Sequence, residues 1–81
     1  MGGPALMITI DAKGTWCPVP IIKLGAAMKV AAAGDIIRVL ATDPGFVPDV
    51  QAWCKGAGHV ILTLESTGPV YAAEVRKAVR P

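Results

Sequence analysis

The sequence predicts an α/β fold, specifically an α+β two-layer sandwich with the element order βαβαββ. Four segments rich in Ile, Val, Leu and Thr are typical of strands, and two others repeat apolar residues at the three- and four-residue steps of helices. Gly, Pro and Asp cluster between these segments, as they do in turns. Because βαβ connections are right-handed, we expect a four-stranded mixed sheet with two helices on one face.

The composition fits one small domain. Of the 81 residues, 53% are hydrophobic, which supplies a compact core and argues against disorder. We expect a single domain over residues 6–78, with a loose lead-in at 1–5 and a frayed end at 79–81. No apolar run approaches the roughly 18 residues of a membrane span, and the N-terminus shows no signal-peptide pattern. A cytoplasmic location without membrane contact is therefore expected.

The first half of the chain is expected to form a strand, a helix and a second strand. The β-rich run at 6–11 predicts the first strand, with Met7 in the core. A helix is expected over 18–33, with Gly34 as its C-terminal cap. The apolar stripe of this helix comprises Ile21, Leu24, Met28 and Ala31. The largely apolar run at 35–41 then predicts the second strand.

The second half is expected to form a helix and then a hairpin. Residues 42–45, Thr-Asp-Pro-Gly, predict a turn. A second helix is expected from residue 46 or 47 to about residue 55. Strands at 60–65 and 70–76 flank the turn-forming residues 66–69, which predicts a terminal hairpin.

The most informative local feature is the Cys-Pro-Val-Pro motif at residues 17–20. It places a thiol directly before the predicted first helix, with Pro18 and Pro20 at the first and third helical positions, where a missing N–H is tolerated. We expect Cys17 to be the N-terminal cap, with its sulfur accepting a hydrogen bond from the N–H of Val19. The positive end of the helix dipole then favours the thiolate. The motif therefore predicts an exposed, activated cysteine.

The second cysteine has a different expected role. Cys54 is far from Cys17 in the sequence, so the two do not form a CxxC redox pair. Cys54 lies beside Trp53 on the packed side of the second helix, which favours a core position over a redox or relay role. The single histidine, His59, lacks further ligands at zinc spacing, so no metal site is predicted.

Four further residues are candidates for supporting roles near the thiol. Asp43 and Asp49 are expected to be turn and helix N-terminal carboxylates that fix the loop after the second strand, and Asp49 could equally shape the surface beside Cys17. Trp16 could either shield the thiol or anchor a partner. Lys23 lies nearly two turns into the helix, which favours contact with a partner's surface over contact with the sulfur.

A series of short motifs along the chain matches a known family in both type and order. The series comprises Cys17-Pro18-Val19-Pro20-Ile21-Ile22-Lys23, Gly34-Asp35, Ala41-Thr42-Asp43-Pro44, Asp49, Trp53-Cys54 and Gly58-His59. By these motifs the chain resembles the TusA/SirA family of small sulfur carrier proteins over about residues 8–77. Gly25 and Ala26 stand where many members carry Lys or Arg, so a less basic docking face is expected.

The resemblance implies a fold and a function. The implied fold is a βαβαββ sandwich similar to the C-terminal domain of translation initiation factor three. The implied function is to accept a persulfide sulfur on Cys17, held covalently without another cofactor, and to pass it to an acceptor protein. The implied donor is a cysteine desulfurase or a rhodanese-like enzyme, and the acceptor is a DsrE-like or tRNA-thiolation protein. The implied destinations are tRNA thiolation, molybdenum cofactor metabolism or sulfur oxidation, without direct nucleic-acid contact.

Two other classes of function stay open. The fold analogy and the isoelectric point near 8.7 suggest a small RNA-binding module, although few aromatic residues are available for base stacking. A redox-regulated interaction module that uses Cys17 and Cys54 is the other alternative. Against both, we expect a sulfurtransferase that acts as a carrier rather than as a stand-alone enzyme.

Overall fold

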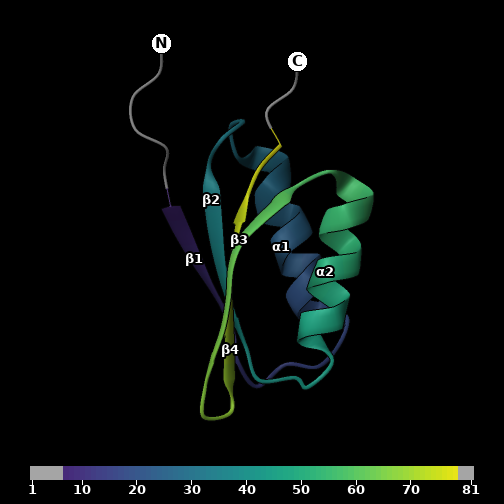
Figure 1. The fold of residues 1–81 in the computed structure, drawn as a ribbon, viewed down its shortest axis with the longest axis vertical. Coiled ribbons are helices and arrows are strands. Elements are labelled where there is room, and N and C mark those ends of the chain that lie inside the picture. Colours follow the sequence, from purple (N-terminus) through teal and green to yellow (C-terminus); the bar gives the residue numbers. More distant parts are fainter. Residues whose placement is uncertain (1–6, 79–81) are drawn as a thin grey trace.

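The computed structural model describes residues 7–78, and it has the predicted order of elements (Figure 1). The segments expected to be loose, residues 1–5 and 79–81, lie outside the described residues. The elements are β1 (Met7–Ala12), α1 (Val19–Val30), β2 (Ile36–Ala41), α2 (Phe46–Ala57), β3 (Val60–Thr67) and β4 (Val70–Arg76).

The four strands form one mixed sheet in the order β1-β2-β4-β3. β1 and β2 are parallel, whereas β4 runs antiparallel to both of its neighbours, β2 and β3. The terminal hairpin therefore places β4 in the centre of the sheet and β3 at its edge. Both helices cover the same face, as predicted (Figure 1). Neither helix of the described chain is long and apolar enough to cross a membrane.

The core lies between the helices and the covered face of the sheet. Strand residues alternate between the two faces, so Ile37, Val39 and Ala41 of β2 point inward and are fully buried. Their partners on β4 include Ala73 and Val75, which are equally buried. The buried hydrophobic residues are Ala12, Leu24, Met28, Ile37, Val39, Ala41, Phe46, Val50, Cys54, Ala73 and Val75. The core position expected for Cys54 is thus confirmed.

Helix α1 ends earlier than predicted, and Gly34 is not its cap. The cap is Ala31, whose backbone is extended (φ −75°, ψ 152°). The Asp35 side chain accepts a hydrogen bond from the N–H of Ala32 (3.0 Å), which offers this N–H a local alternative to the helix. Lys77 Nζ, from the chain after β4, donates to the carbonyl of Ala31 (2.6 Å). Gly34 instead supplies a positive φ of 91° in the turn before β2.

The prediction of a core position for Met7 is wrong. Met7 pairs with Ile36 on the sheet face that no helix covers, and 55% of its surface is exposed. The β1 residues that point toward the helices are the alternate ones, which end at the buried Ala12. A run of apolar residues in an edge strand does not by itself identify the buried face.

Candidate functional site

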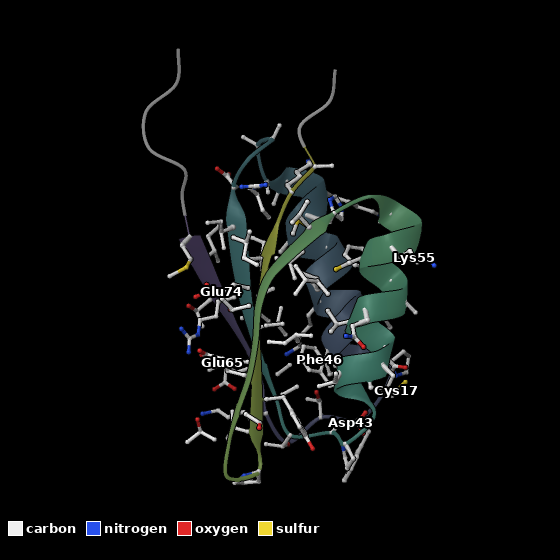
Figure 2. The ribbon with its side chains drawn as sticks, viewed as in Figure 1. Cys17, Asp43, Phe46, Lys55, Glu65 and Glu74 are labelled. Atoms are coloured by element: carbon white, nitrogen blue, oxygen red, sulfur yellow. The ribbon has the colours of Figure 1, made fainter. Side chains whose placement is uncertain are left out.

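Cys17 is exposed and lies in the loop between β1 and α1. Because β1 and β2 are parallel neighbours, the loops that follow them meet at the same edge of the sheet. Asp43 belongs to the loop after β2, and Figure 2 shows it at the same end of the molecule as Cys17. The site is therefore built from two loops that are distant in sequence.

At the start of α1, the structure differs from the prediction in the residue that caps the helix and in the hydrogen bond of Val19. Pro18, not Cys17, is the N-terminal cap, and no side-chain hydrogen bond caps this helix in the described chain. The N–H of Val19 donates to the carbonyl of Trp16 (2.8 Å), so it is not available to the Cys17 sulfur. Pro20 occupies the second helical position, where its missing N–H breaks no helical bond. The expected Cys17–Val19 hydrogen bond is thus wrong.

Asp43 holds the Cys17 loop against the loop after β2. Its Oδ2 accepts the N–H of Cys17 at 2.6 Å, and its Oδ1 accepts the N–H of Gly45 at 3.1 Å. The residue is only 8% exposed. The Gly45 bond fits a turn carboxylate, whereas the bond to Cys17 was not anticipated from the sequence. One buried carboxylate therefore orients the backbone of the exposed cysteine.

A second contact between these loops comes from Thr42, for which no individual role was predicted. Its Oγ1 accepts the N–H of Gly14 at 2.9 Å. In the same loop, Thr15 Oγ1 donates to the carbonyl of Ala12 (2.7 Å). The Ala-Thr-Asp-Pro segment thus supplies two neighbouring side chains that fasten the loop carrying Cys17.

The electrostatic environment of Cys17 opposes the predicted thiolate. A hydrogen bond with the Asp49 carboxylate raises the pKa of Cys17, and partial desolvation and the charges of Asp49 and Asp43 raise it further. Asp49 lies in the first turn of α2, beside the loop that carries Asp43. The prediction of a favoured thiolate considered only the helix dipole of α1. It is wrong, because two nearby carboxylates favour the neutral thiol.

The second thiol lies in a different environment. Cys54 is 2% exposed in the core, and burial raises its pKa to about 11. Both cysteines are free. At neutral pH Cys54 is a buried neutral thiol, which does not fit a redox pair with the exposed Cys17.

Two exposed apolar side chains lie close to Cys17 in the sequence. Trp16 is 70% exposed and Ile22 on α1 is 61% exposed, with the exposed Lys23 beside it. Gly25, one of the two positions that depart from the family pattern, faces Trp53: a Cβ added there would lie 3.6 Å from Trp53 Cζ2. Trp53 therefore packs beside Gly25.

The fold is shared with SirA-like proteins. The crystal structure of a SirA-like protein from Desulfitobacterium hafniense matches this structure with a TM-score of 0.78 and 30% sequence identity. The match covers 90% of this chain and 100% of that chain.

Residues 8–77 also match the model of the family described as Sulfurtransferase TusA. The chain therefore belongs to the TusA family. Its relatives include a candidate sulfur carrier protein of Halobacterium salinarum, 41% identical over 70 residues, with 85% of this chain and 86% of the relative covered. The sulfur carrier protein TusA of Pseudomonas entomophila is 35% identical over 69 residues, with 85% and 86% covered.

Some similar proteins are much longer than this chain, among them a candidate sulfur carrier protein of Aquifex aeolicus, of which this chain spans 36%. YrkF of Bacillus subtilis, a candidate sulfur carrier protein, is 41% identical over 70 residues, which are 86% of this chain. The chain spans only 38% of YrkF.

Proposed function

We propose that this chain is a sulfur carrier that holds a persulfide on Cys17 and passes its outer sulfur to an acceptor protein. The observation that supports it most is the exposed thiol of Cys17, held at the sheet edge by the bond from its N–H to the buried Asp43. Membership in the TusA family supports the same function. A thiol presented in this way reaches a sulfur atom bound to another protein without a binding pocket of its own.

The chemistry requires two exchange steps and no net oxidation. In loading, the Cys17 thiolate attacks the outer sulfur of a donor persulfide, and the donor's thiolate leaves. In delivery, an acceptor thiolate attacks the outer sulfur on Cys17, and the Cys17 thiolate leaves. The transferred sulfur keeps its oxidation state throughout. The partner proteins thus complete each step, which fits a carrier rather than a stand-alone enzyme.

We propose that partners dock on the exposed side chains of Trp16 and Ile22 and on the neighbouring Lys23. An exposed aromatic side chain beside the reacting atom is a typical anchor at protein interfaces. The proposed donor is a cysteine desulfurase or a rhodanese-like enzyme, and the proposed acceptor is a DsrE-like or tRNA-thiolation protein. The cytoplasm is the proposed compartment for these exchanges.

The test compares sulfur loading of the wild type with that of Cys17→Ser, using Cys54→Ala as the matched thiol control. After incubation with a persulfide donor, intact mass spectrometry measures how much of each protein has gained one sulfur atom. The wild type and Cys54→Ala are expected to gain it, and Cys17→Ser is not. Gain of sulfur by Cys17→Ser at wild-type stoichiometry would refute Cys17 as the carrier residue.

A further inference from the structure

Two carboxylates on the β2–α2 segment border the carrier cysteine. Asp43 Oδ2 lies 2.6 Å from the backbone nitrogen of Cys17. Asp43 and Asp49 also border the same space over Gly45, where an added Cβ would lie 3.7 Å from Asp43 Oδ1 and 3.8 Å from Asp49 Oδ2. Cys17, Asp43 and Asp49 therefore form one cluster, assembled by two loops and the first turn of α2.

The two states of the carrier differ in charge at this cluster. The empty carrier presents a neutral thiol. The loaded carrier presents a persulfide, which is more acidic than a thiol and is an anion at neutral pH. Its negative charge resides on the outer sulfur, so loading places an anion beside two carboxylates. Neighbouring like charges repel each other, and this repulsion acts on the anionic loaded state and not on the neutral thiol.

We propose that Asp49 and Asp43 are positioning residues that bias Cys17 toward releasing sulfur, because they favour the neutral thiol over the anionic persulfide. This inference rests on the proposed function of Cys17 as the carrier. It assigns the carboxylates a role in the direction of transfer, beyond their place in the loop.

The electrostatics of the empty state agree with this role. A hydrogen bond with Asp49, desolvation and the charges of both carboxylates all raise the pKa of Cys17. The carboxylates thus disfavour an anion on the first sulfur of the site, and they act in the same sense on an anion at the outer sulfur.

The reaction that measures this bias is an exchange with a small persulfide. In it, R–S–S⁻ and the Cys17 thiol give R–SH and the Cys17 persulfide anion. The outer sulfur moves to Cys17, the Cys17 proton moves to the departing sulfur, and no electrons are gained or lost. We choose the persulfide of 2-mercaptoethanol, because its only charge is that of the persulfide itself.

The experiment determines the equilibrium constant of loading for the wild type, Asp49→Asn and Glu65→Gln by intact mass spectrometry. Asp49→Asn is expected to load about two- to fivefold more favourably than the wild type, the range of an exposed charge pair. Glu65→Gln is the matched control, because it removes the same charge from β3 on the uncovered sheet face, away from Cys17 (Figure 2). It is expected to load like the wild type.

A second measurement uses only the wild type, so its result does not depend on whether a variant folds. For the wild type, loading is expected to become more favourable as salt is raised, because the Debye length falls from about 10 Å at 0.1 M to about 3 Å at 1 M. The inference is overturned if Asp49→Asn and the wild type have equal equilibrium constants of loading. It is also overturned if the wild-type constant does not change with salt concentration. In both cases Cys17 remains the carrier. Absence of any loading at Cys17 overturns the proposed function as well.

Discussion

Replacing Asp43 by Ala should destabilise the fold and release the Cys17 loop. The substitution removes the acceptor of two backbone N–H groups, those of Cys17 (2.6 Å) and Gly45 (3.1 Å). A hydrogen bond to a charged group contributes about 1.5–3 kcal/mol, and water can partly replace the acceptor for the exposed Cys17. We therefore expect the free energy of unfolding to fall by about 2–3 kcal/mol. Asp43→Asn retains one acceptor oxygen and should lose about half as much.

Urea unfolding monitored by circular dichroism measures this loss. For a chain of this size, with an m value of about 1 kcal/mol/M, the midpoint of Asp43→Ala should fall by about 2–3 M. Asp11→Ala is the matched control: Asp11 Oδ1 also accepts a backbone N–H, that of Lys13 (3.0 Å), but its side chain is 63% exposed. This control should lose less than about 0.5 kcal/mol. If Asp43→Ala unfolds at the same midpoint as Asp11→Ala, Asp43 does not hold the loop as argued.

Two further predictions concern His59 and the two thiols. His59 Nδ1 accepts the N–H of Ala78 (3.0 Å), and burial and then the charge of Lys77 lower the pKa of His59 below its ordinary 6.5. The neutral form is therefore favoured by folding, so this contribution is complete above pH 6.5 and is lost as the pH falls through the lowered value. Urea midpoints at pH 7 and pH 5.5 should differ more for the wild type than for His59→Gln, and equal differences would contradict the assignment. In native protein at pH 8, iodoacetamide should modify Cys17 more slowly than an unstructured peptide cysteine, and it should modify Cys54 only after unfolding, as peptide mapping would show.

The order of elements was predictable from local patterns, whereas the end of α1 was not. The apolar runs of β2 and β4 are bounded by Gly, Pro and Asp, and both strands start within one residue of their predicted positions. Helix α1 has no comparable local stop signal before Gly34. It ends early where Asp35 bonds to Ala32 and where Lys77, distant in sequence, bonds to the carbonyl of Ala31. Boundaries that depend on such tertiary bonds cannot be derived from helical periodicity alone.

The position of the exposed cysteine was predictable, but its electrostatics were not. The Cys-Pro-Val-Pro motif placed the thiol at the junction of β1 and α1, where the structure has it. The expected thiolate rested on the dipole of α1, which is a local argument. The carboxylates that reverse it come from the β2–α2 segment, with Asp43 26 positions away from Cys17. One signal could have brought them together: loops that follow two parallel neighbouring strands lie at the same sheet edge.

These electrostatics lead to a condition on the partner that loads the carrier. A donor that presents Lys or Arg beside Asp49 would offset the carboxylate charge while the two proteins are docked. The pKa of the Cys17 thiol would fall, which favours the attacking thiolate, and the repulsion on the new persulfide would diminish. After dissociation the carboxylates would act again on the loaded state, so transfer to the next thiol would be favourable. The direction of transfer would then depend on which partner neutralises Asp49, and the exposed Trp16 side chain would be open to both partners.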